Sequence, residues 1–267
     1  MDFYKCASVN TSDSTWSGYK AVITDGMITG YVTSVTSGLT YMGIIPLIGR
    51  IYTEDAKIEI TNDIPRNPVF YLSLASQKNI AETGQSLDVR DNINFSTVDG
   101  VPCGYFNGNS KIFVQNILSP GVQSISFSFW AKAPSPSSNY VCQIYLGDTE
   151  RTYYRCFGCF YYGSTGIDFS AAADELQDTN IITHSNWNNI ILMHDALTNT
   201  SSVYINGTLA LTKTRSVDLK TDLLSIGTTT ASTDSFQGYI SSVRIYNRTL
   251  SEMEISALAS EFTPTNS

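Results

Sequence analysis

The sequence predicts an all-β protein, a two-sheet antiparallel sandwich preceded by a small N-terminal β module. Apolar and polar residues alternate along several stretches, which is the period of a strand with one buried face. Turn pairs such as Asn206-Gly207 interrupt the alternation and are typical of β-hairpins. Only 15% of the residues are charged, and the abundant Ser, Thr, Asn, Gly and Tyr suit strands and turns better than helices.

Charge and hydropathy argue against two classes of partner. The formal net charge is −8 and no Lys/Arg cluster offsets it, so we expect no nucleic-acid partner. No apolar run approaches the roughly 20 residues of a membrane span, so we expect no membrane partner. The first residues, MDFYKCASVN, lack the basic and apolar regions of a secretory signal. The protein is therefore expected to be made without such a signal, or to have lost it.

The first strands are expected in a separate module, residues 1–64. Short apolar runs there are divided by turns such as Asp25-Gly26, and no helix signal interrupts them. About sixty residues are marginal for an independent core, so this module should lean on the sandwich or on a neighbouring subunit. Residues 65–68 contain two prolines and are expected to form a linker, and residues 69–267 the sandwich.

The sandwich strands follow in order. They are expected at 70–74, within 94–114, at 124–133, 141–146, 151–162, 188–195, 203–211 and 239–245. Ser251 and Glu254 form a capping-box pattern that predicts a short helix after the last strand. The residues expected to face inward are Trp130, Phe129 or Phe127, Ile191 or Leu192, Ile205, Val243 and Ile245.

The last segment, FQGYISSVRIYNRTLSEMEISAL, resembles the C-terminal half of laminin-G-like domains, which belong to the concanavalin-A-like lectin/glucanase jelly rolls. The stretch VDGVPCGYFNGNSKIFV resembles the opening of these domains, and SISFSFWAKA resembles their strand that ends in Trp. The resemblance covers roughly residues 69 to 260. It implies a lectin-like jelly roll but does not identify the ligand.

Enzymatic activity is not expected. Laminarinase-type relatives carry two carboxylates in a Glu-x-Asp-x-x-Glu run on one strand, and this chain has no such run. We interpret the acidic group Asp174, Glu175 and Asp178 as a solvated loop or short helix. His194-Asp195 lacks a Gly-x-Ser-x-Gly nucleophile motif, so His194 is expected to be a satisfied strand-end histidine.

Cys156 and Cys159 form a lone Cys-x-x-Cys pattern without the second pair of a zinc ribbon. Phe157-Gly158 resembles a hairpin tip, which would place the two cysteines across from each other. A cross-strand disulfide and two ordinary thiols both remain open, and the thiols are favoured.

Aromatic density suggests where a ligand would bind. Tyr153-Tyr154 and Tyr161-Tyr162 are neighbour pairs, and strand alternation sends one member of each pair out of the core. The alternative is that these tyrosines line the second sheet or contact the N-terminal module. The Thr/Ser-rich stretch 228–236 is expected to be an exposed loop. We predict that a surface glycan or partner contacts Asp148, Tyr154, Tyr161 and Asp234.

The resemblance also raises calcium binding, because many laminin-G-like relatives bind calcium in rim loops. Asp148 and Asp234 are the candidates. No dense Asp-x-Asp-x-Asp array accompanies them, so we expect no metal and no cofactor.

Two functions are consistent with these patterns: a lectin-like adhesion module and an architectural capsid or tail protein. YKCASVNTSDSTWSGYKAVITDG is similar to virion proteins of tailed phages of gut bacteria that carry a laminin-G-like domain. This similarity implies a virion protein assembled in the host cytoplasm, with host surface glycans, other virion subunits and a homo-oligomer as partners. The competing interpretation is a secreted or cell-surface carbohydrate-binding protein of a bacterium.

Overall fold

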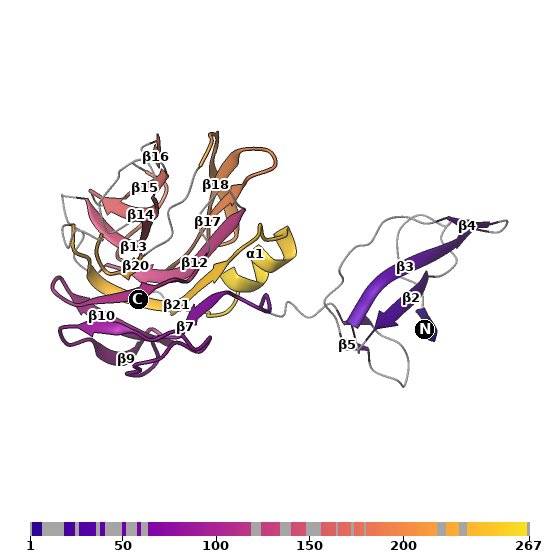
Figure 1. Cartoon of the computed structure of the whole chain (residues 1–267), viewed down its shortest axis with the longest axis horizontal. Coiled ribbons are helices and arrows are strands. Elements are labelled where there is room, and N and C mark those ends of the chain that lie inside the picture. Colours follow the sequence, from indigo (N-terminus) through magenta and orange to yellow (C-terminus); the bar gives the residue numbers. More distant parts are fainter. Residues whose placement is uncertain are drawn as a thin grey trace. The chain divides into compact units, whose positions relative to one another are not determined.

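A computed structural model divides the chain into two compact units, Met1–Asp63 and Ile64–Ser267 (Figure 1). In the first unit the structure describes the strands only. In the second unit it describes residues 64–118, 124–133, 140–147, 156–163, 165–171, 174–178, 180–217, 223–229 and 234–265. Within these described residues no helix is long and apolar enough to cross a membrane.

The first unit is built from antiparallel strands. Its described strands are β1 (Asp2–Cys6), β2 (Tyr19–Thr24), β3 (Met27–Val35), β4 (Gly38–Thr40), β5 (Arg50–Ile51) and β6 (Ile58–Glu59). The first four pair in chain order as a meander, and β5 pairs with β6.

The second unit is an antiparallel jelly-roll sandwich, as the sequence predicts. In its described part, the back sheet has the order β19 (Thr208–Thr214), β18 (Thr200–Ile205), β17 (Asn188–Asp195), β12 (Ile125–Lys132), β21 (Gln237–Tyr246), β10 (Val101–Asn107) and β9 (Asn94–Val98), with β7 (Phe70–Leu72) also paired to β21. The front sheet has the order β16 (Asp174–Asp178), β15 (Gly166–Ala171), β14 (Phe157–Tyr162), β13 (Val141–Gly147), β20 (Leu223–Ile226), β11 (Lys111–Gln115) and β8 (Asp88–Arg90). Figure 1 shows the two sheets facing each other.

The core lies between the sheets because alternate residues of each strand point inward. Phe127 of the back sheet meets Phe157 of the front sheet edge to face, with ring centroids 4.8 Å apart, and Phe157 meets Phe169 at 4.7 Å. Val243 and Ile245 are fully buried in the same core. These contacts confirm the inward orientation expected for Phe127, Val243 and Ile245.

The predicted hairpin between β18 and β19 is present. Asn206 and Gly207 both have positive φ angles, 50° and 81°. A two-residue turn with both central residues in this region matches the right-handed twist of the strands it joins. This turn therefore sets the pairing of β18 with β19.

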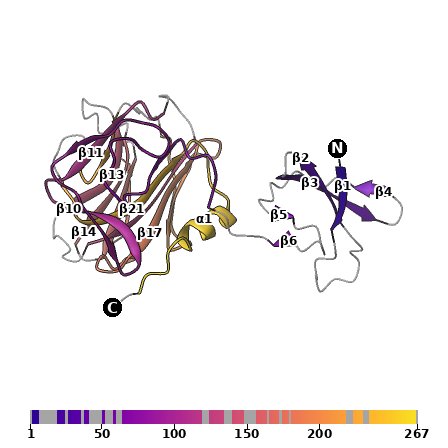
Figure 2. The same cartoon turned by 90° about the horizontal axis from the view of Figure 1, so that it is seen from below.

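Helix α1 (Glu252–Ala259) covers part of the outer face of the back sheet. Ile255 and Leu258 pack with Ile191 of β17 and Tyr246 of β21, and Figure 2 shows α1 beside these strands, with β11 and β13 on the far side of the sandwich. The predicted capping box is confirmed, because the Ser251 side chain accepts from the Glu254 amide and the Glu254 carboxylate accepts from the Ser251 amide.

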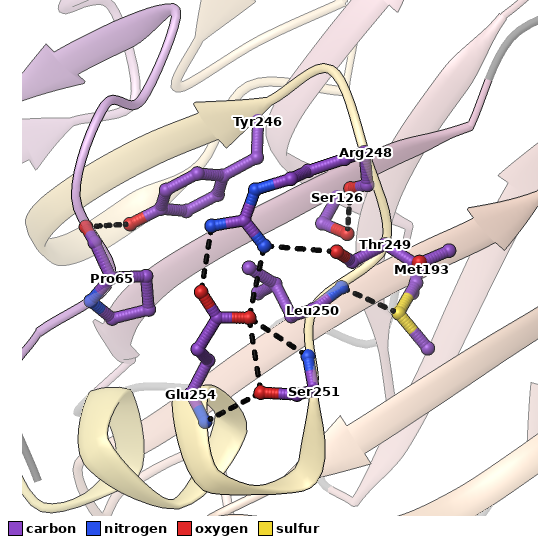
Figure 3. A network of polar contacts seen from close by, with 9 residues as sticks. All are labelled: Pro65, Ser126, Met193, Tyr246, Arg248, Thr249, Leu250, Ser251 and Glu254. Atoms are coloured by element: carbon purple, nitrogen blue, oxygen red, sulfur yellow. Dashed lines mark hydrogen bonds and ion pairs between the residues drawn. The ribbon is translucent and has the colours of Figure 1, made fainter. Parts of the chain in front are cut away.

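A polar network fixes α1 to the preceding strand (Figure 3). The two terminal guanidinium nitrogens of Arg248 donate to the Glu254 carboxylate, at 2.7 and 2.9 Å. Tyr246 Oη donates to the carbonyl of Pro65 at 3.1 Å, which ties the start of the unit to its last strand. These contacts give the residues of the Tyr-Asn-Arg-x-Leu-Ser-x-x-Glu pattern a structural role.

Three expectations about local structure are wrong. Trp130 is buried on the outer side of the back sheet with Trp187, because alternate residues of β12, including Phe129 and Ala131, face the main core. The acidic group at 174–178 is strand β16, paired with β15, and not a loop or helix. Phe157-Gly158 is not a hairpin tip but the start of β14, and Cys156 and Cys159 are thiols that form no disulfide.

Candidate functional site

The alternation of β14 decides which tyrosine reaches the surface, and it contradicts the prediction for Tyr161. Tyr161 is only 1% exposed and lies in the main core. Its ring stacks on the buried His184 at 3.9 Å. The next residue, Tyr162, points the other way and is half-buried at the outer face of the front sheet. The sequence prediction therefore chose the wrong member of the pair.

Tyr162 forms an exposed aromatic surface with Tyr140, which comes just before β13. The two rings are stacked, with centroids 5.0 Å apart and planes 23° from parallel, and Tyr140 is 42% exposed. We call this pair the tyrosine platform. Gly166 on β15 pairs with Tyr162, and a Cβ at Gly166 would lie 2.8 Å from the Tyr162 ring. The absence of a side chain there lets the ring lie over the neighbouring strand.

Polar side chains of β16 border the platform. Tyr140 Oη donates to Gln177 Oε1 at 3.4 Å, and Gln177 Nε2 donates to Glu175 Oε2 at 2.6 Å. Glu175 and Gln177 are both exposed. An aromatic face edged by amide and carboxylate groups offers both a stacking surface and hydrogen-bond partners.

Asp168 lies on the same outer face, between Phe160 of β14 and Gln177 of β16. It is 3% exposed, and among the described residues nothing hydrogen-bonds to its Oδ1. Burial, and then the nearby Glu175, raise the pKa of Asp168 to about 7, although Arg215 acts in the opposite direction. A buried carboxyl group with such a pKa beside an exposed surface is a common feature of functional sites.

The negative charge of these carboxyl groups extends to the platform. Partial burial, then Asp168 and Glu175, raise the pKa of Tyr140. The pKa of Tyr162 is raised by burial, by Tyr140 and by the carboxylates, which here include Asp178. Among the described residues, the charges that act on the two platform tyrosines are therefore negative.

The other three predicted site residues are Asp148, Tyr154 and Asp234. Asp148 and Tyr154 lie outside the described residues. Asp234 is exposed, and its carbonyl accepts from the Cys142 amide at 2.7 Å, near the start of β13. This contact places Asp234 at the same end of the front sheet as Tyr140. The described part of the expected 228–236 loop is only partly exposed, since Thr228 and Phe236 are buried.

The two histidines, His184 and His194, are buried in the interior. His194 is fully buried, and its Nδ1 lies 3.0 Å from Ser201 Oγ. Burial lowers the pKa of His194 and of His184, so both favour the neutral form. In the described part of the chain, no group of three or more His, Cys, Asp or Glu side chains is arranged to hold a metal ion.

Sequence reasoning missed Tyr140, Gln177 and Asp168. The Tyr161-Tyr162 pair pointed to the correct strand but not to the correct member. Tyr140 has no signal of its own, because it precedes its strand and meets Tyr162 only through the β13–β14 pairing.

Fold and site together define a β-sandwich of the jelly-roll class with an aromatic, acidic patch on one outer face. A sequence model of the concanavalin A-like lectin/glucanases superfamily matches residues 106–256. The chain therefore belongs to this superfamily. No curated protein matches it in sequence.

Solved structures share the fold at low sequence identity. Domain 4 of AbnA, a GH43 extracellular arabinanase from Geobacillus stearothermophilus, in complex with arabinotriose, is 17% identical, with a TM-score of 0.57 over 72% of this chain and 98% of that domain. The botulinum neurotoxin serotype D ligand-binding domain in complex with N-acetylneuraminic acid is 17% identical (TM-score 0.58, 73% of this chain). The serotype G binding domain is also 17% identical, with a TM-score of 0.59. The alignments span about half of these neurotoxin chains, 50% and 51%.

Proposed function

We propose that this protein is a non-catalytic glycan-recognition protein that binds its ligand on the tyrosine platform. The observation that carries the proposal is the exposed, stacked pair of Tyr140 and Tyr162 beside the Gln177 and Glu175 side chains. Aromatic rings pack against the apolar C–H face of a sugar, while amides and carboxylates accept or donate hydrogen bonds to its hydroxyl groups.

The geometry suits this task because the platform is already ordered. The Tyr162 ring is held by its strand and by the space over Gly166, and the Tyr140 hydroxyl is held by Gln177. Fewer rotamers are then lost when a ligand binds, which favours affinity. Two superfamily-fold structures contain arabinotriose and N-acetylneuraminic acid, and this supports a sugar as the ligand here.

The first experiment is a glycan-array screen of the full chain, followed by titration calorimetry with the best ligand. Tyr140→Ala should weaken binding about tenfold, because one stacked aromatic contributes on the order of 1–2 kcal/mol. Tyr140→Phe keeps the ring and should bind within about threefold of wild type, since it loses only one exposed hydrogen bond.

The chain offers a matched control on the opposite side of the sandwich. Tyr105 and Tyr239 of the back sheet are also partly exposed, with ring centroids 5.0 Å apart. Tyr105→Ala removes a comparable aromatic and should leave the affinity unchanged. If Tyr105→Ala weakens binding more than Tyr140→Ala, the platform is not the binding site. If no glycan binds at all, the platform is not a glycan site and an architectural role is favoured.

Absence of catalysis and of a metal requirement belongs to the same proposal. The protein should release no reducing sugar from the glycan it binds, and chelation of calcium should not change its affinity. Hydrolysis that is abolished by Glu175→Gln would instead identify a glycosidase. Loss of binding on chelation would instead indicate a calcium site, for which Asp148 and Asp234 are the candidates.

The biological setting that we propose is a phage virion appendage, with a bacterial surface protein as the competitor. The similarity of the N-terminal sequence to virion proteins supports the first. Mass spectrometry of purified virions tests it: detection of the chain supports a virion protein, and its recovery only from bacterial envelopes supports the competitor.

A further inference from the structure

Among the described residues, several carboxyl groups lie around the tyrosine platform. Glu175 and Asp178 of β16 and the buried Asp168 of β15 all act on the platform tyrosines. Asp234 is exposed at the same end of the front sheet. Asp168 is nearly fully buried on the outer face, and among the described residues its Oδ1 accepts no hydrogen bond.

Among the described residues two cations, Arg215 and Lys213, lie nearby, and Arg215 partly offsets the charge of Asp168. The Arg215 guanidinium is in the interior, 4.3 Å from the centre of the Phe169 ring, and donates to Ser201 Oγ at 2.9 Å. Lys213 Nζ donates to the backbone carbonyl of Glu175 at 3.3 Å. The Glu175 carboxylate accepts from Gln177 Nε2 at 2.6 Å and, because it is exposed, can also accept from an incoming donor.

The faces of the two tyrosine rings also favour a positively charged group on the ligand. The faces of tyrosine rings attract cations because of their quadrupole. An exposed carboxylate beside such a face is the arrangement that binds an ammonium group, and it repels a carboxylate or sulfate group.

From this arrangement, and resting on the proposed glycan-binding role, we propose that the platform selects glycans with a free, protonated amino group. Amino-sugar residues of the glucosamine type place their C–H face on Tyr140 and direct the ammonium group to Glu175. Asp168 adds negative charge from beneath the face in the fraction of molecules in which it is ionised. Glycans rich in uronic or sialic acid are disfavoured.

The test uses the full chain and three probes of similar length. These are a glucosamine tetramer, an N-acetylglucosamine tetramer that differs only in the blocked amine, and a galacturonic acid tetramer. Titration calorimetry at neutral pH should give roughly tenfold tighter binding of the glucosamine tetramer than of its acetylated counterpart, since a hydrogen bond to a charged group is worth about one order of magnitude. The galacturonic acid tetramer should not bind measurably.

Three variants test whether the platform is responsible for the preference for a free amine. Glu175→Gln keeps the size of an exposed side chain and should reduce the preference for the free amine to within about threefold. Asp168→Asn should reduce it partly. Asp88→Asn removes an exposed carboxylate from β8, at the opposite edge of the same sheet, and should leave the preference intact.

The outcomes separate the two proposals. Preference for the glucosamine tetramer that is lost in Glu175→Gln but kept in Asp88→Asn supports the inference. Equal binding of the acetylated tetramer, binding of the galacturonic acid tetramer, or an unchanged preference in Glu175→Gln overturns it and leaves glycan recognition standing. If none of the three binds and the glycan array is also empty, both proposals are overturned.

Discussion

Replacing Asp168 by asparagine should make the protein more stable above neutral pH, although a charged side chain is being removed. Asparagine has the shape of the protonated carboxyl group and carries no charge. Burial raises the pKa of Asp168 from its ordinary 3.8 to about 7 in the folded chain, with Glu175 adding to the effect. The ionised form of Asp168 is therefore costly to the folded state.

The sign of the pH dependence follows from where the proton is bound. Below about pH 4 the carboxyl group is protonated in both states and costs nothing. Between about pH 4 and 7 the folded chain keeps a proton that the unfolded chain releases, so stability falls as the pH rises. At 1.36 kcal/mol for each pH unit, the total loss reaches about 4 kcal/mol above pH 7.

Asp168→Asn removes this loss. Relative to wild type, the variant should gain nothing at pH 4 and up to about 4 kcal/mol at pH 8, which corresponds to roughly 10 °C in Tm for a unit of this size. Urea unfolding at pH 4, 6 and 8, followed by the fluorescence of the buried Trp130 and Trp187, measures the difference. All other titrating groups are common to both proteins, so the difference isolates Asp168.

Asp88→Asn serves as the control, because it makes the same chemical change at an exposed position and should stay within about 1 kcal/mol of wild type at each pH. Equal stability of wild type and Asp168→Asn at pH 8 would refute the reasoning, as would a gain of the same size at pH 4 and pH 8. Either result would mean that Asp168 is not held as a buried acid.

Three further predictions concern stability and are read from urea midpoints. Val243→Asp places an unpaired charge between the sheets and should cost several kcal/mol; a urea midpoint equal to that of wild type would place Val243 outside the core. Glu261→Gln weakens the buried bidentate pair that Glu261 forms with Arg244, at 2.7 Å for each contact, and should cost about 3 kcal/mol; a neutral effect would show that the C-terminal segment is not held by this pair. Ser251→Ala removes the helix N-cap and should cost about 1 kcal/mol, and no loss at all would contradict the capping role that Figure 3 shows for it.

The residue pattern alone was sufficient for the architecture. Alternation predicts that Phe127, Val243 and Ile245 face the core, because a strand has only two faces and one of them must leave water. Asn206-Gly207 predicts its hairpin because both residues tolerate positive φ, and Ser251 with Glu254 predicts α1 because each satisfies a free amide of the other. These signals depend only on residues that are close in the sequence, so they can be recognised without knowing which strands pair.

The candidate site depends on relations between distant residues, which local signals do not contain. Alternation requires that one of Tyr161 and Tyr162 faces outward, but only the pairing of β14 with β13, including the register shift after Cys142, decides which one. Tyr140 becomes part of the platform because antiparallel pairing brings it beside Tyr162. Asp168 has its raised pKa because Phe160 and Gln177 flank it across two strands and remove it from water. Burial and strand register are properties of the assembled sheets, so the tertiary structure alone decides which polar and aromatic side chains form the site.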